Sequence, residues 1–160
     1  MSRGITTGTA EGIFSPQEQL TRSQYLVMLM RAYGIEPDAQ PKDNFLDAGS
    51  TYYTGYLAAA KRLNITKGIG SNLFAPERPI TRQEMFTLLY NTLKELGELP
   101  VGTTGTTLES FRDADKVAPW AKEAMEYLAK TGMVRGSDGL LTPESIATRA
   151  EMAQVLYNLL

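Results

Sequence analysis

The sequence predicts an all-α protein in which a helix-loop-helix unit repeats along the chain. The strongest observation is a motif of proline, four residues and Thr-Arg, which occurs three times, as PQEQLTRSQ, PERPITRQE and PESIATRAE from Pro16, Pro76 and Pro143. Apolar residues follow each arginine with helical spacing, and no segment alternates cleanly as a half-buried strand would. Repeats of this length are typical of helical units that bury their apolar faces against one another.

Each Thr-Arg pair is predicted to start a helix. Thr81 and Glu84 form the pattern of a capping box, in which the threonine hydroxyl accepts from the third helical amide and the glutamate returns to the threonine amide. The apolar stripes that follow the three arginines are Tyr25, Leu26, Leu29, Met30 and Tyr33, then Met85, Phe86, Leu89, Tyr90 and Leu93, and finally Met152, Ala153, Leu156, Tyr157 and Leu160. Such stripes predict the core faces of three amphipathic helices.

Further repeated elements lie upstream of the motif. Gly-rich loops align on Gly8, Gly68 and Gly136, which predicts tight connections between helices. Two Phe-x-Asp-Ala segments, FLDAGSTYYTGYLAAAKRL and FRDADKVAPWAKEAMEYLAKT, predict a second helix, but only two copies are present. We therefore expect repeat 1 at residues 1–40 with its leading helix missing or truncated, repeat 2 at 41–100 and repeat 3 at 101–160, together forming one compact domain.

Composition excludes several classes of partner. A net charge of -2 argues against non-specific nucleic-acid binding, which requires a basic stripe. No apolar run approaches the roughly 18 residues that a membrane-spanning helix needs, so membrane insertion is not expected. No signal peptide begins the chain, so any export signal is expected outside it. The absence of cysteine is compatible with an extracellular location.

The absence of both histidine and cysteine also excludes most catalytic chemistry. Histidine is the commonest general base and metal ligand, so catalytic triads and ordinary zinc sites are not expected. Asp113 and Asp115 resemble a fragment of a calcium loop, but the central glycine and closing glutamate of that loop are missing. A hydrolase using two carboxylates is disfavoured because Glu84 and Glu151 already fit capping roles. We expect no catalytic residue, no metal and no cofactor.

The order of Phe-x-Asp-Ala, an aromatic helix start, a Gly-rich loop, Phe-x-Pro and Ile-Thr-Arg-x-Glu resembles the S-layer homology (SLH) domain family, over nearly the whole chain. The resemblance implies three helix-loop-helix units around a pseudo-threefold axis. It also implies a non-catalytic module that holds a secreted protein on the bacterial cell wall or S-layer. The implied ligand is a secondary cell-wall polysaccharide, often carrying pyruvate ketals.

An arginine at a helix start is unfavourable by roughly 0.3 to 1 kcal/mol, so stability alone does not select it. Next to unpaired helix amides it would form an anion site suited to a carboxylate. The resemblance assigns recognition of the ligand's charge to Arg22, Arg82 and Arg149. It assigns hydrogen bonds from sugar hydroxyls to Asp47 and Asp113, and contact with a sugar ring to Tyr52 and Trp120. Arginine-to-alanine variants are therefore predicted to lose binding while keeping their stability.

Structural alternatives remain open for these residues. The two aspartates also fit a capping or turn role, Trp120 also fits a core position, and the arginines also fit salt bridges between repeats. Gln24 replaces the usual glutamate in the first copy, but it can still close a capping box. A rival function uses the same fold for self-assembly or for contacts with S-layer or other surface proteins, because fold does not determine function.

Overall fold

The computed structural model describes residues 18–103 and 105–159. Over this range the secondary structure consists of helices and isolated β-bridges, without a strand. The helices are α1 (Arg22–Ala32), α2 (Thr54–Arg62), α3 (Arg82–Leu96), α4 (Pro119–Lys130) and α5 (Arg149–Leu159), with short 3-10 helices η1 (Leu108–Ser110) and η2 (Ala114–Lys116). The all-α prediction is therefore confirmed.

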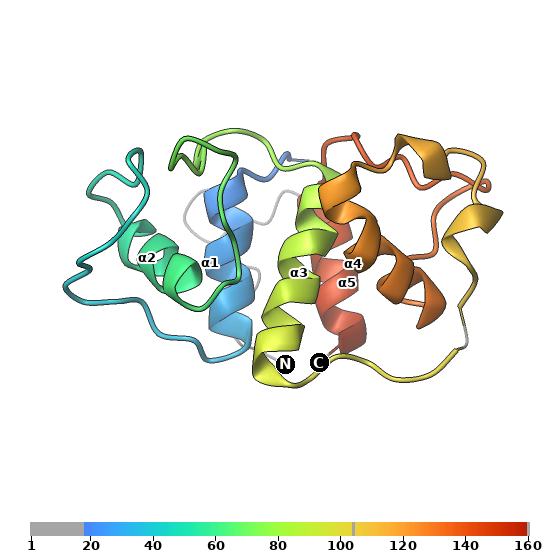
Figure 1. Ribbon diagram of the computed structural model, residues 1–160, viewed down its shortest axis with the longest axis horizontal. Helices are drawn as coiled ribbons and strands as arrows, with labels where there is room; N and C mark the ends of the chain where they lie inside the picture. Colours follow the sequence, from blue (N-terminus) through green and yellow to red (C-terminus); the bar gives the residue numbers. More distant parts are fainter. Residues whose placement is uncertain (1–17, 104, 160) are drawn as a thin grey trace. The chain divides into compact units, whose positions relative to one another are not determined.

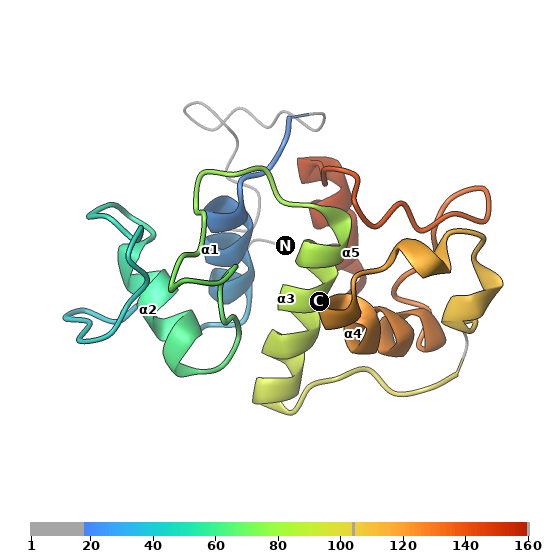
Figure 2. The same ribbon diagram turned by 45° about the horizontal axis from the view of Figure 1, so that its top comes forward.

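The chain divides into two compact units. The described part of the first unit consists of residues 18–80 and 148–159, and the second unit consists of residues 81–103 and 105–147. In the first unit α2 packs beside α1, and in the second unit α4 packs beside α3 (Figures 1 and 2). The arrangement of all repeats in one domain around a pseudo-threefold axis stays a prediction. The loop of repeat 1 that contains Gly8 lies outside the described residues.

The three predicted capping boxes are confirmed. Thr81 accepts a hydrogen bond from the amide of Glu84 at 3.3 Å, and the Glu84 carboxylate accepts from the amide of Thr81 at 2.9 Å. The same reciprocal pair occurs at Thr148, with distances of 3.2 and 2.8 Å. In the first copy Gln24 replaces the glutamate and still closes the box with Thr21. Each box satisfies two amides that a helix start would otherwise leave without intrahelical partners.

The apolar stripes form most of the core. Tyr25 and Leu29 on α1, Met85 on α3 and Met152 on α5 are each fully buried. Leu160 of the third stripe lies outside the described residues. Tyr157 departs from the prediction, because its side chain is 75% exposed in the last turn of α5. Its phenol group tolerates water, and the prediction that it belongs to the core face is wrong.

Two equivalent glycines make the tight loops between the helices of each unit. Gly68 and Gly136 have φ angles of +81° and +71°, a left-handed conformation that L side chains resist. A Cβ atom at Gly68 would also collide with the Leu73 carbonyl oxygen and the Phe45 ring, and one at Gly136 would meet the equivalent Phe111. These glycines allow each loop to turn back towards the following Thr-Arg motif.

Candidate functional site

In each unit, the loop that follows the tight glycine turn hydrogen-bonds to a helix start. In the first unit the Ser23 amide of α1 donates to the Pro76 carbonyl at 3.0 Å. In the second unit the Gln83 amide of α3 donates to the Pro143 carbonyl at 2.9 Å, and the Arg82 amide donates to the Ser145 carbonyl at 2.8 Å. The expectation of unpaired amides at these two helix starts is therefore wrong, and an anion would have to meet side chains instead.

The arginine side chains reach the same loops. Arg22 Nε donates to the Phe74 carbonyl at 2.8 Å, and its guanidinium carbon lies 4.5 Å from the centroid of the Phe74 ring. Arg82 Nε makes the equivalent bond to the Leu141 carbonyl at 2.9 Å. Arg149 is buried at the start of α5, and the residue that repeats the position of Phe74, Phe14, lies outside the described residues. Arg22 and Arg82, which the sequence predicted as anion-binding residues, therefore each hold a loop in place through a hydrogen bond.

The two predicted aspartates hold these loops from the amide side. Asp47 accepts hydrogen bonds from the amides of Phe74 at 2.9 Å and Ala75 at 2.8 Å, one at each carboxylate oxygen. Asp113 repeats this arrangement with the amides of Leu141 at 2.8 Å and Thr142 at 2.9 Å. The two aspartates thus hold a loop that lies far along the sequence, which differs from the local capping or turn role that the sequence left open.

The aspartates stabilise an unfavourable backbone conformation. Ala75 and Thr142, which occupy the same position in the two loops, have φ angles of 59° and 46°. A left-handed conformation costs an L residue about 1 to 2 kcal/mol, and a β-branched residue such as threonine adopts it least readily. The paired hydrogen bonds from Asp47 and Asp113 offset this cost and fix the shape of the loop.

The charge of Asp113 is favoured by its hydrogen bonds. Burial of this side chain opposes ionisation, but the donated amides of Leu141 and Thr142 outweigh burial and hold the pKa of Asp113 below its ordinary value. Lys116 acts in the same direction. The carboxylate is therefore the form that holds the loop at neutral pH.

The two predicted aromatic residues lie on the surface. Tyr52 is 59% exposed and Trp120 is 57% exposed, so Trp120 is not the core anchor that the sequence left as an alternative. The ring of Tyr52 makes an edge contact with Tyr53 at a centroid distance of 5.3 Å, and the Tyr53 hydroxyl donates to Glu77 at 2.8 Å. These contacts orient the tyrosine rings of the first unit while Tyr52 stays accessible to solvent.

The residue that follows the arginine contacts the segment that carries the exposed ring. In the first unit Tyr52 interacts with the Ser23 hydroxyl. In the second unit the amide of Ala118, two residues before Trp120, donates to Gln83 Oε1 at 2.9 Å. The sequence did not single out Ser23 or Gln83, because the third repeat has Ala150 at this position and no repeated signal exists.

Charged side chains act on Tyr52 from several elements of the first unit. Burial raises the pKa of Tyr52 and Glu77 adds to the increase, while Ser23, Arg31 and Arg149 act in the opposite direction. Two cationic side chains therefore lie within electrostatic reach of this exposed ring. Arg31 was not predicted as a site residue, because the other repeats have no arginine at its position.

The structure thus brings the predicted residues together in two sets. The first unit gathers Arg22, Asp47, Tyr52 and Arg149, and the second unit gathers Arg82, Asp113 and Trp120. Arg22 and Arg149 are only 4% and 1% exposed, whereas Arg82 is half-buried. The second set therefore has the arginine that solvent reaches most easily.

Within residues 18–103 and 105–159, no three carboxylate side chains are grouped in a way that could hold a metal ion. Within the same ranges, each helix is too short or too polar to cross a membrane.

The fold and the site define a helical repeat protein that presents aromatic and cationic side chains next to rigid loops. The chain belongs to the S-layer homology domain family, whose model matches residues 2–26, 44–86 and 110–153. This membership identifies it as a cell-surface anchoring module, located on the outside of the bacterial cell.

Similar proteins include both surface-layer proteins and enzymes. The chain is 30% identical to the S-layer protein sap of Bacillus anthracis over 98% of its length, and 30% identical to Exoglucanase XynX of Acetivibrio thermocellus over 99%. A third relative, the amylopullulanase of Thermoanaerobacterium thermosulfurigenes, is 30% identical over 99% of the chain. The chain spans only 18%, 14% and 8% of these three proteins, respectively.

Proposed function

We propose that the chain anchors a larger protein non-covalently on the bacterial surface by binding an anionic, pyruvylated secondary cell-wall polysaccharide. The observation that carries this proposal is that each unit has a more than half-exposed aromatic ring on an element that is hydrogen-bonded to the residue after the arginine: Tyr52 itself bonds to Ser23, and the backbone of Ala118, at the start of the helix that carries Trp120, bonds to Gln83. An aromatic ring offers a flat apolar surface for a sugar ring, and a guanidinium offers paired donors for a carboxylate. The net charge of the chain is only -2, so local cationic groups can still attract such a polymer.

The second set is proposed as the main binding site. Arg82 would contact the acidic substituent of the polymer, and Trp120 would pack against a neighbouring sugar. Asp113 would act as a positioning residue, because both of its oxygens already hold the loop that Arg82 contacts. In the first unit Tyr52 would pack against a sugar ring close to the positive charges of Arg31 and Arg149, and Asp47 would position the loop that contains Phe74. Arg22, which is 4% exposed, would support this site mainly through its loop contact.

A co-sedimentation experiment with purified cell walls tests the proposal. The chain should sediment with native walls and remain in solution with walls from which the secondary polymer has been chemically extracted. Defined fragments with and without the pyruvyl group should then differ in affinity by about ten-fold or more, since a charge-assisted hydrogen bond is worth roughly 1.5 to 3 kcal/mol. Equal affinity for both fragments would show that the arginines do not recognise an acidic group.

The same experiment addresses the rival function. Several of the similar proteins, among them sap of Bacillus anthracis, are named as S-layer proteins, which favours self-assembly or contact with another surface protein as the second candidate. In that case the chain would sediment equally well with extracted walls that retain their surface proteins. It would also self-associate in solution without any polymer.

A further inference from the structure

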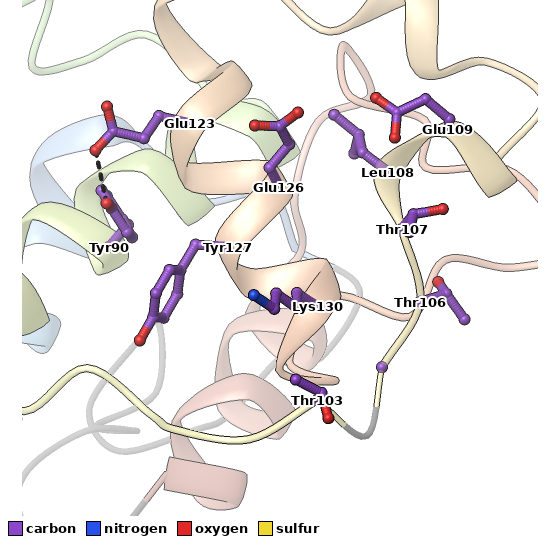
Figure 3. Close-up of a pocket in the computed structure, with 11 residues that line it drawn as sticks. Tyr90, Thr103, Thr106, Thr107, Leu108, Glu109, Glu123, Glu126, Tyr127 and Lys130 are labelled. Carbon is purple, nitrogen blue, oxygen red and sulfur yellow. Dashed lines mark hydrogen bonds between the residues drawn. The ribbon is translucent and has the colours of Figure 1, made fainter.

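A cavity of about 610 Å³ opens in the second unit, away from the start of α3. Figure 3 shows it between α4 and the segment that leads to η1, with Tyr127 and Lys130 on one side and Thr106 and Thr107 on the other. Its volume lies in the range of roughly 300 to 1,000 Å³ that is usual for small-molecule sites. Neither Arg82 nor Trp120 lines it, so it is distinct from the site proposed above.

A longer connection creates this cavity. Phe45 follows Thr21 by 24 residues in the first unit, whereas Phe111 follows Thr81 by 30 residues in the second. In the first unit the shorter connection closes onto α2, where the Asp38 amide donates to the Gly55 carbonyl at 3.0 Å. A Cβ at Gly55 would collide with the Asp38 carbonyl oxygen, so no side chain fits between the two segments.

The second unit has a large side chain at the corresponding place. Glu123 follows Gly55 by 68 residues, the same interval that separates Trp120 from Tyr52. The longer connection is held away from the middle of α4 by contacts at both ends. The Tyr127 hydroxyl donates to the Pro100 carbonyl at 2.7 Å, and the Gly105 amide donates to the Lys130 carbonyl at 2.9 Å. Tyr127 and Lys130 of α4 line the cavity on one side, and Thr106 and Leu108 line it on the other.

Two tyrosines form the aromatic part of the lining. The rings of Tyr90 and Tyr127 lie 5.6 Å apart between centroids, and the Tyr90 hydroxyl donates to Glu123 at 2.6 Å. Burial and this hydrogen bond raise the pKa of Tyr90 to about 12, so its hydroxyl stays protonated at neutral pH. The Tyr127 ring is half-buried and offers a flat surface to a bound molecule.

The charged part of the lining is acidic. Three carboxylates, those of Glu109, Glu123 and Glu126, line the cavity together with one ammonium group, that of Lys130, and Lys94 lies 3.6 Å from Glu123 outside the cavity. Within residues 18–103 and 105–159, Glu123 is bonded to Tyr90, whereas the exposed carboxylates of Glu109 and Glu126 have no hydrogen bond or ion pair. This charge pattern repels an anionic ligand and attracts a cationic one.

We propose that the cavity binds a saccharide that carries a free, protonated amine. Glu126 holds the ammonium group, and the ring of Tyr127 packs against the sugar face. Such a site has the opposite charge preference to the arginine-containing sites. It therefore gives the module a second recognition element that does not depend on the proposed polymer binding.

The test uses the full chain and two matched oligosaccharides, a β-1,4-linked glucosamine trimer and its fully N-acetylated form, measured by calorimetry. The glucosamine trimer should bind at least ten-fold more tightly than the acetylated trimer, because acetylation removes the positive charge and places a neutral acetyl group where Glu126 is proposed to hold the ammonium group. Glu126→Gln, an isosteric change at an exposed position, should weaken binding of the glucosamine trimer by about five-fold or more. Glu144→Gln changes an exposed carboxylate outside the cavity and should leave the affinity unchanged.

Any one of four results would overturn the proposal. The glucosamine trimer could fail to bind, both trimers could bind equally, or Glu126→Gln could bind the glucosamine trimer with unchanged affinity. The fourth result is equal affinity for a trilysine peptide, which would show a general cation-attracting surface without sugar recognition. Far-UV circular dichroism of Glu126→Gln shows whether the variant retains its fold. None of these results depends on whether the chain binds wall polymer.

Discussion

Arg82 and Leu141 are joined by a 2.9 Å hydrogen bond from the guanidinium Nε to the backbone carbonyl, although 59 residues separate them in the sequence. The amide of Leu141 is held by Asp113 at 2.8 Å. The amide nitrogen and the carbonyl oxygen of one loop residue are thus both fixed by charged side chains. The same relationship joins Arg22 and Asp47 to Phe74 in the first unit. The arginines therefore stabilise the fold as well as serving the proposed binding site.

Arg82→Ala is expected to lower the free energy of unfolding by about 1 to 3 kcal/mol. The change leaves the Leu141 carbonyl without its charged donor, and a hydrogen bond to a charged group contributes roughly 1.5 to 3 kcal/mol. This replaces the expectation from sequence that the variant keeps its stability, which considered only the helix dipole. Arg82→Lys should recover only part of the loss, because an ammonium group cannot reproduce the planar donor geometry.

Chemical denaturation measures these differences. Lys122→Ala removes an exposed cation from α4 and should change the free energy of unfolding by less than about 0.5 kcal/mol. If Arg82→Ala unfolds at the same denaturant concentration as the parent chain, the bond to Leu141 contributes nothing to stability.

Asp113→Asn is expected to destabilise the fold by about 1 to 3 kcal/mol at pH 7, because a neutral amide has one acceptor oxygen in place of the two that hold Leu141 and Thr142. The folded-state pKa of Asp113 lies below its ordinary value of 3.8, so the ionised form is the one that folding favours. Its contribution is present above pH 4 or so, and is lost as the pH falls through the lower, folded-state pKa. The difference between the two proteins should therefore shrink below about pH 4.

Denaturation midpoints measured at several pH values check this dependence. Asp115→Asn is the matched control, since it removes an exposed carboxylate two residues away. A stability difference for Asp113→Asn that stays constant down to pH 2 would contradict the assigned role of the ionised carboxylate.

Thr81→Ala is expected to lower the free energy of unfolding by about 0.5 to 2 kcal/mol, because it removes the acceptor for the Glu84 amide at the start of α3. Thr103→Ala, at an exposed position outside any helix, should have a much smaller effect. Thermal or chemical denaturation of both variants gives the comparison. An unchanged midpoint for Thr81→Ala would mean that the capping box does not hold the end of this helix in solution.

Local features of the fold were predictable from the sequence because they depend on neighbouring residues. The capping box at Thr81 needs only Glu84 three positions later, and the buried stripe on α1 needs only helical spacing. The tight turns at Gly68 and Gly136 were likewise visible as repeated glycines. In each case one short segment contains all the partners.

Contacts between distant segments were not predictable in the same way. A threonine-arginine pair at a helix start does not reveal that Arg82 will reach a carbonyl 59 residues later, so the sequence suggested an anion site with unpaired amides. Nor did the sequence reveal that one of those amides, that of Gln83, donates a hydrogen bond to the Pro143 carbonyl. The cavity beside Tyr127 depends on where a longer connection runs, and only its extra length was visible in the sequence.

Trp120→Ala and Tyr52→Ala are expected to weaken binding to secondary wall polymer while leaving stability nearly unchanged. Both side chains are more than half exposed, so their removal opens no cavity in the core, and we expect shifts of less than about 1 kcal/mol in the free energy of unfolding. Loss of a sugar-packing surface should reduce affinity by about ten-fold, which corresponds to roughly 1.4 kcal/mol. Trp120→Ala should have the larger effect, because the accessible Arg82 lies in its unit.

Tyr157→Ala is the matched control for both variants, because it removes an aromatic side chain that is 75% exposed on α5 and belongs to neither proposed set. Its affinity for the polymer should equal that of the parent chain. Binding is measured by calorimetry with extracted polymer, and stability by thermal denaturation of the same preparations. If all three variants bind normally, the exposed rings do not contact the polymer, and a glycan site beside the Thr-Arg helix starts is refuted. If Trp120→Ala and Tyr52→Ala lose affinity while Tyr157→Ala does not, at unchanged melting temperatures, then these surface rings contact the ligand and contribute little to the stability of the fold.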